Sequence, residues 1–279
     1  MTTVRRQNIR KNHTKSRLLF FACLAALLLF AAAAAEHLCP YDPYAQDYAS
    51  ALCPPSPAHP FGTDRYGRDM LSRVIMGAKT SVFSSLVLVL IISVLGTCAG
   101  IVCGYLGGWV DTVIMRISDL CLAFPGLVFA MGIAAVLNGG LGNAVLALAA
   151  VSWPKYARLA RSQTLAVNHT DFMDAARLAG GRPLGMIRRH ILPNILGPIL
   201  VTAALDIGAM MMELAGLSFL GLGAMPPTAE WGSMMSNGRS MLQTYPWVVM
   251  APGAAIFVTA AIFNLFGDAL RDYLDPKNR

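Results

Sequence analysis

The sequence predicts an all-α, polytopic membrane protein with six transmembrane helices. Its 279 residues are 56% hydrophobic and only 13% charged, with a mean hydropathy of +0.55, whereas about 25% of the residues of a soluble domain are charged. A bilayer core about 30 Å thick requires roughly 20 apolar residues per helix. Runs of suitable length cover residues 18–38, 82–103, 117–137, 143–160, 195–217 and 247–266.

The first run forms one unit with the basic tail before it, over residues 1–38. A basic head and an alanine-rich end at 31–35 are also typical of a cleaved signal peptide. The apolar part is 18 residues long without interruption, and the apolar region of a signal peptide usually has about 7 to 15. We therefore expect a retained membrane anchor.

The placement of Lys and Arg predicts the orientation. Of the 22 basic residues, 17 lie in the amino-terminal tail, the connection after the second run, the region from Lys155 to Arg189, and the carboxyl tail, 271–279. The other side receives five. By the positive-inside rule both termini are cytoplasmic in a multi-pass membrane protein. The net charge of +7 then reflects topology, and nucleic acid is not expected as a partner.

Residues 39–80 are predicted to form an external segment. Its first half is rich in proline, which favours turns and extended chain. In the second half, Thr63 or Asp64 is a candidate helix cap, and Met70, Val74 and Ile75 share an apolar face. This pattern predicts an amphipathic helix at the membrane interface, before the second run.

Two of the six cysteines, Cys39 and Cys53, lie in this external segment. They are either free or joined by a disulfide in an oxidising compartment, and spacing alone does not decide between the two. The cysteines inside the apolar runs are expected to be buried as small hydrophobic residues.

A polar, basic stretch, DFMDAARLAGGRPLGMIRRHILPN, occupies residues 171–194 between two apolar runs. It predicts helix, turn and helix, because Gly180 and Gly181 supply a left-handed stop and Pro183 suits the start of a second helix, which Pro193 ends. The first helix shows a face of mostly small residues. That face comprises Phe172, Ala175, Ala176 and Ala179.

The stretch cannot cross the bilayer, because each of its arginines would cost about 2.5 to 3.5 kcal/mol at the centre of a span. A solvated loop that only holds topology is one interpretation. Such a loop has no need of a small-residue face, whereas a helix that fits into a groove of a partner protein does. We therefore favour a docking function.

The stretch resembles the EAA loop of permease subunits of bacterial ABC importers, the coupling helix that contacts the ATPase subunit. In that pattern an acid, two alanines, a glycine and a final Leu-Pro recur, and Asp174 stands where Glu is usual. The resemblance assigns ATPase coupling, within a loop at 161–194, to Asp174, Ala175, Ala176, Gly180, Gly181, Leu192 and Pro193.

Further blocks resemble the second permease of the dipeptide, oligopeptide and nickel importer group: HPFGTDRYGRDMLSR, GYLGGWVDTVIMRISD, LAFPGLV, SFLGLGAMPPTAEWGSM and FNLFGDALRDYLDP. The resemblance implies the type I ABC permease fold, with a five-helix core at 81–270. It also implies a homologous second permease, two cytoplasmic ATPase subunits and an external substrate-binding protein as partners. The chain itself is then not an enzyme, needs no cofactor and does not hydrolyse ATP.

Two acids fall within the fifth run. Asp206 and Glu213 are seven residues apart on roughly one helix face, with Met210 between them. Acids inside a membrane mark a pathway or a buried partner, so these residues are candidates for the translocation path, and a structural role for Asp206 remains the alternative. A third possibility, an intramembrane hydrolase, is disfavoured because seven residues span about 10.5 Å along a helix.

The cargo suggested by the sequence is nickel or a nickel chelate. Residues 205–227, with the PTAEWG block, look closer to nickel permeases, and soft Met and Cys side chains suit late transition metals. No metal ligands are assigned. The alternative cargo within the same group is a dipeptide or oligopeptide.

Overall fold

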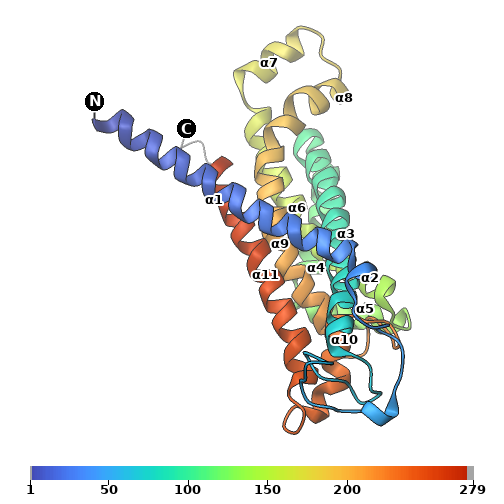
Figure 1. Cartoon of the computed structure of the whole chain (residues 1–279). Coiled ribbons are helices and arrows are strands. Elements are labelled where there is room, and N and C mark those ends of the chain that lie inside the picture. Colours follow the sequence, from blue (N-terminus) through green and yellow to red (C-terminus); the bar gives the residue numbers. More distant parts are fainter. Residues whose placement is uncertain (1, 275–279) are drawn as a thin grey trace.

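The computed structural model describes residues 2–274, and their side chains from residue 14 onward. Long helices lie side by side along one axis (Figure 1). Two short helices, α7 and α8, project from one end of this bundle, and the segment before α3 and the helix α10 lie at the opposite end. Helix α1 crosses the bundle obliquely and packs against α11.

The described chain is helical apart from its connections. The helices are α1 (Thr2–Ala33), α2 (Ala35–Leu38), η1 (Tyr48–Ser50), α3 (Met70–Leu106), α4 (Gly108–Leu122), α5 (Gly126–Val136), α6 (Leu141–Asn168), α7 (Asp171–Leu178), α8 (Pro183–Met186), η2 (Ile187–Ile191), α9 (Leu192–Phe219), α10 (Trp231–Gly238), η3 (Arg239–Met241) and α11 (Trp247–Leu274).

All six predicted apolar runs are helical. Within the described residues, four helical stretches are long and apolar enough to cross a membrane: Thr14–Ala33, Met70–Leu106, Pro183–Phe219 and Trp247–Leu274. The third run is a pair of helices, α4 and α5, bent by 92°. The bend falls at Pro125, which lacks an N–H and disfavours helix in the residue before it. Helix α6 carries the fourth run but is less apolar, because three cations interrupt it.

Helix α3 corrects the predicted interfacial helix. The helix begins at Met70, where the Asp69 carboxylate accepts a hydrogen bond from the backbone N–H of Ser72, so neither Thr63 nor Asp64 is the cap. It then continues without a break for 37 residues. The polar face expected to meet solvent is buried instead: Arg73 is only 3% exposed, because the external segment folds back over it.

The most extensive helix contact joins α3 to α6. Glycines recur at every fourth position of α3, at Gly96, Gly100 and Gly104, and all three face α6. A Cβ atom added at Gly100 would lie 2.3 Å from the backbone oxygen of Ala157. Small residues allow such approach between membrane helices, where van der Waals packing rather than hydrophobic burial drives association.

The cysteines of the external segment are free in this structure. The Cys39 thiol donates a hydrogen bond to the backbone oxygen of Ser72 at 3.3 Å, and Cys53 pairs through its backbone with Thr63. Cys39 therefore attaches the segment to the start of α3, and Cys53 links two parts of the segment to each other, both without a disulfide.

We predict that Gly100→Ala destabilises the protein. The added methyl group has no room against α6, and overpacking of this kind costs about 1–3 kcal/mol. The melting temperature of the detergent-purified protein should fall. Gly197→Ala on α9 is the matched control, because a Cβ atom there meets nothing within 4 Å; a variant at Gly100 as stable as that control would contradict the close contact.

Candidate functional site: a projecting coupling segment and a charged pair between two helices

Residues 171–194, which the sequence predicted to couple to an ATPase, are called the coupling segment. This segment begins with helix α7, and α7 ends at the glycine stop that the sequence predicts. Gly180 has a φ of +81°, and the N–H groups of Gly180 and Gly181 donate to the backbone oxygens of Arg177 and Ala176 at 2.9 and 3.0 Å. These two bonds form a Schellman motif. A side chain at Gly181 would collide with the Ala176 oxygen at 2.8 Å, so both glycines are required by the turn.

The exposed face of α7 matches the predicted docking face except at one position. Phe172, Ala175 and Ala179 are exposed, as expected for a docking face. Ala176 instead turns inward and packs with the buried side chains of the core. The most exposed large apolar residue is Leu178, at 91%.

Leu178 and Leu184 belong to the exposed surface of this segment, although neither was assigned to ATPase coupling from the sequence. Leu184 is 77% exposed, while Met186 beside it is buried at 2%. The signal in the sequence is the presence of two leucines on a polar, basic stretch. Asp174 pairs with Arg177 at 2.7 Å on the same surface.

We predicted that the second helix of the segment ends at Pro193. This prediction is wrong, because the chain remains helical past Pro193. A π-helical stretch, η2, follows α8 and leads directly into α9, where Leu192 and Pro193 form the first turn. Pro193 lacks an N–H, which is tolerated in a first helical turn. The backbone N–H of Leu192 donates to the Ile187 oxygen, a bond of π-helical span. The coupling segment is thus continuous with a membrane-crossing helix.

Halfway along the bundle, Lys155 of α6 donates to Asp206 of α9 at 2.5 Å. Each residue is the fifteenth of a 28-residue helix, so the pair lies midway along two antiparallel elements. We counted Lys155 among the cytoplasmic basic residues; its place at the middle of α6 is a correction. The side chain of Asp206 is 5% exposed and that of Lys155 is 58% exposed.

Two buried polar atoms next to this pair lack a hydrogen-bond partner. They are the hydroxyl of Tyr156 and the second carboxylate oxygen, Oδ2, of Asp206. The two groups interact electrostatically with each other. Buried polar atoms are usually bonded, and an orphan calls for an explanation in terms of function or an alternative arrangement.

The remaining path candidates lie beyond the pair on α9. Glu213 is half-buried and interacts electrostatically with Asp206 and Lys155. Met210 is buried, at 7% exposure. Because Asp206 pairs with Lys155 and Glu213 is about two turns away, the two acids do not form the close pair that a hydrolase would require.

Helix α6 carries two further ion pairs on the turns that follow Lys155. Arg158 bonds to Asp119 of α4 at 2.6 Å, and Arg161 holds Asp111 of α4 with two bonds of 2.6 Å each. The bidentate geometry of Arg161 is the stronger arrangement for a guanidinium and a carboxylate. The three cations that make α6 less apolar are therefore all matched by carboxylates on neighbouring helices.

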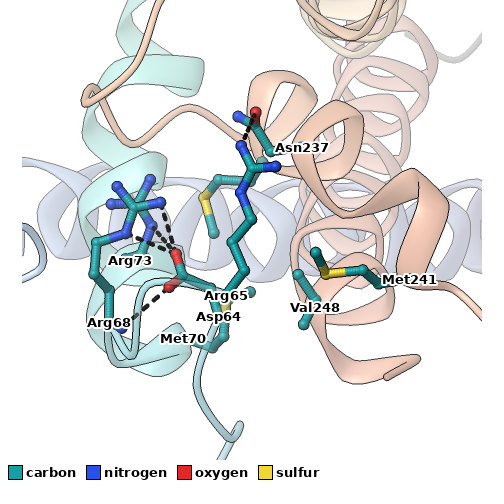
Figure 2. A pocket seen from close by; sticks show the side chains of 9 residues that line it. Asp64, Arg65, Arg68, Met70, Arg73, Asn237, Met241 and Val248 are labelled. Carbon is teal, nitrogen blue, oxygen red and sulfur yellow. Dashed lines mark hydrogen bonds and ion pairs between the residues drawn. The ribbon is translucent and has the colours of Figure 1, made fainter. Parts of the chain in front are cut away.

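At the end of the bundle opposite α7, a buried ionic cluster holds the external segment against α3 and α10. Figure 2 shows Arg68 and Arg73 converging on Asp64, while Arg65 reaches towards Asn237 of α10. Arg68 lies 2.7 Å and Arg73 3.7 Å from the Asp64 carboxylate. With Asp64, Arg68 and Arg73 all at most 5% exposed, this cluster fixes the loop rather than presenting free charge.

Helix α10, which begins at Trp231 near the end of the PTAEWG block, is attached to α3 by its cap, Glu230. The Glu230 carboxylate accepts N–H groups of Gly232 and Ser233 at 3.0 and 2.7 Å, and the hydroxyl of Ser81 at 3.3 Å. The Trp231 indole donates to the Val74 backbone oxygen at 2.9 Å. Burial raises the pKa of the Glu230 carboxyl, and the N–H donors oppose that shift. The block therefore has a structural function.

Within residues 14–274, no three His, Cys, Asp or Glu side chains lie close enough together to hold a metal ion. Asp206 and Glu213, the two acids of α9 that we predicted as path candidates, do not belong to such a group. The chemistry available at the middle of the bundle is therefore that of one ammonium group, two carboxylates and a phenol.

The long apolar helices, four of them among residues 14–274 of sufficient length to cross a membrane, are those of an integral membrane protein. The sequence model for the binding-protein-dependent transport system inner membrane component matches residues 96–279. The chain belongs to this family, whose members are permease subunits of ABC importers in the inner membrane.

Three relatives match the chain over nearly its whole length. The probable D,D-dipeptide transport system permease DdpC of Escherichia coli K12 is 46% identical over 92% of this chain and 86% of its own. The dipeptide transport system permease DppC of Haemophilus influenzae is 40% identical over 93% of this chain and 89% of its own. The glutathione transport system permease GsiD of Pectobacterium atrosepticum is 43% identical over 92% and 86%.

A solved structure supports the fold. The inward-facing MetNI methionine ABC transporter matches with a TM-score of 0.59 and 16% identity, over 74% of this chain and 98% of that chain. The all-α permease architecture predicted from the sequence is confirmed by these matches.

Proposed function

We propose that this chain is a permease subunit of an ATP-driven importer of short peptides. The observation that carries the proposal is identity of 40–46% over more than nine-tenths of the chain with permeases named for dipeptides and for glutathione, itself a tripeptide. The relatives favour the peptide alternative over the nickel cargo that we first inferred.

We expect the complete transporter to import dipeptides and not nickel. The test reconstitutes this chain with its second permease, two ATPases and binding protein in proteoliposomes, and measures uptake of a radiolabelled dipeptide and of radioactive nickel. Dipeptide uptake should require ATP and exceed an ATP-free control at least about tenfold. ATP-dependent nickel uptake without peptide uptake would return the assignment to nickel.

The coupling segment is proposed to bind the ATPase subunit through its exposed apolar surface. Leu178 and Leu184 present large apolar side chains to solvent next to the small residues Ala175 and Ala179. Exposed leucines beside small residues suit insertion into a groove. Because the segment continues directly into α9, displacement of the groove would act on a membrane-crossing helix.

Replacing Leu178 by Asp should uncouple the transporter. Burial of a leucine in an interface contributes about 1.5–3 kcal/mol, so we expect ATPase binding and peptide uptake to fall at least about tenfold. Leu178 is 91% exposed in the isolated chain, so the fold itself should be unaffected. The control is Leu242→Asp, an exposed leucine at the opposite end of the bundle; equal uptake by both variants would refute the docking surface.

The orientation proposed is that α7, α8 and both termini face the cytoplasm. In Figure 1, α1 begins and α11 ends towards the end of the bundle that carries α7. This arrangement agrees with the excess of basic residues in those regions.

In a background with all six cysteines replaced, an Arg182→Cys variant should resist an impermeant thiol reagent in intact cells. A Ser56→Cys variant in the external segment should react, because Ser56 is exposed at the opposite end. Permeabilised cells provide the control, in which both positions should be labelled. Labelling of Arg182→Cys in intact cells would reverse the orientation.

A further inference from the structure

We propose that the Lys155–Asp206 pair, together with Glu213, is a subsite for the charged termini of a short peptide in transit. Lys155 takes the C-terminal carboxylate, and Glu213 takes the N-terminal ammonium group. The inference rests on the proposed peptide cargo. It adds to that function a pair of residues that determine which end of the peptide lies at which depth.

The placement of Lys155 is the first observation. Its side chain is 58% exposed although it lies at the middle of α6. A cation at that depth faces a polar path or a protein partner, since contact with lipid is too costly. The exposed positions of α6 before Lys155 are uncharged: Gly142, Leu146 and Ala150. Arg158 is the next exposed position after it. Lys155 is thus the first charge that this exposed surface presents to a cargo moving from the α10 end.

The donor capacity of Lys155 is the second observation. An ammonium group has three N–H donors, and in the described chain Lys155 directs a single hydrogen bond, to Asp206. The exposed side of the ammonium group therefore retains donors for a peptide carboxylate. A carboxylate bound there gains a charge-assisted hydrogen bond, which is stronger than a bond between neutral groups.

The third observation is that Tyr156 can replace Lys155 as the hydrogen-bond donor to Asp206 when Lys155 binds a cargo. If Lys155 turns towards a cargo carboxylate, Asp206 loses its donor while remaining 95% buried by side-chain area. The adjacent Tyr156 hydroxyl interacts with Asp206 but makes no full hydrogen bond in this structure, so it can move closer and donate to Asp206 in place of Lys155. The arrangement therefore allows Lys155 to change partners without leaving the buried carboxylate uncompensated.

The spacing to Glu213 fits a short peptide. Seven residues separate Asp206 from Glu213, which corresponds to about 10.5 Å along α9 at 1.5 Å per residue. An extended chain spans about 3.3–3.6 Å per residue, so two or three residues cover about 7–11 Å. Glu213 is half-buried and lies within the electrostatic reach of Lys155. A dipeptide or tripeptide can thus bring one terminus to each group.

The experiment compares a dipeptide with its C-terminal amide in the reconstituted transporter. The double variant Lys155→Met/Asp206→Asn removes the cation and its buried counter-ion together, so that no unpaired charge remains. Both compounds are supplied at concentrations that load the binding protein equally, and uptake by the variant is divided by wild-type uptake for each. The preference of the binding protein cancels in this ratio.

We expect uptake of the free dipeptide to fall at least about tenfold in the double variant, corresponding to about 1.4 kcal/mol, and uptake of the amide to change less than about twofold. The matched control is Arg158→Met/Asp119→Asn, which removes the neighbouring ion pair of α6 and should leave both ratios near one. Co-purification with the ATPases checks that each variant assembles. Lys155→Gln, which retains a donor to Asp206 but no charge, serves as a second variant if the double variant does not assemble.

Equal losses for the dipeptide and the amide would show that the pair is only structural and would overturn the subsite. Unchanged uptake of both would overturn it as well. Failure of the wild-type transporter to import any peptide would instead refute the proposed function, and the subsite with it. The two failures are therefore distinguishable in one set of measurements.

Discussion

The central interaction of the bundle is the pairing of three cations along one helix, α6, with carboxylates of its neighbours. The partners come from two helices, Asp206 on α9 and Asp111 and Asp119 on α4. The most buried of these carboxylates is Asp206, whose side chain is 5% exposed. The three pairs join α6 to both α4 and α9.

Close packing, rather than ion pairing, holds α6 against α3. On its other side α6 lies against α3, where three glycines four residues apart let the backbone of α3 approach α6 closely. Two lateral constraints thus act on one helix: backbone contact on one side and ion pairing on the other. A helix held in this way keeps its register, and the exposed surface that carries Lys155 keeps its direction.

Each end of the bundle is built for a different purpose. The end with α10 is closed by buried polar groups, with Asp64 between two arginines and Glu230 capping α10 onto α3. The other end presents exposed leucines on a projecting segment that continues through a π-helical stretch into α9. The same helix then carries Asp206 and Glu213. One continuous element therefore links the proposed docking surface with the proposed cargo subsite.

The sequence by itself determined the class of protein, because the lengths of apolar runs and the density of charge are local properties. It also determined the glycine stop after α7, since a left-handed residue and its two hydrogen bonds involve neighbours in the chain. The sequence did not decide where a helix begins or ends when several neighbouring residues could each cap or interrupt it. Asp69 rather than Thr63 or Asp64 begins α3, and a π-helical stretch carries the chain past Pro193.

Only the tertiary structure decided which charges are paired and which apolar residues are exposed. Lys155 and Asp206 are separated by 51 positions, and no local pattern reveals that two antiparallel helices bring their midpoints together. The inward turn of Ala176 likewise depends on how α7 sits against the rest of the chain. Periodicity gives a helix its faces, but the direction in which each face points is set by packing against elements distant in sequence.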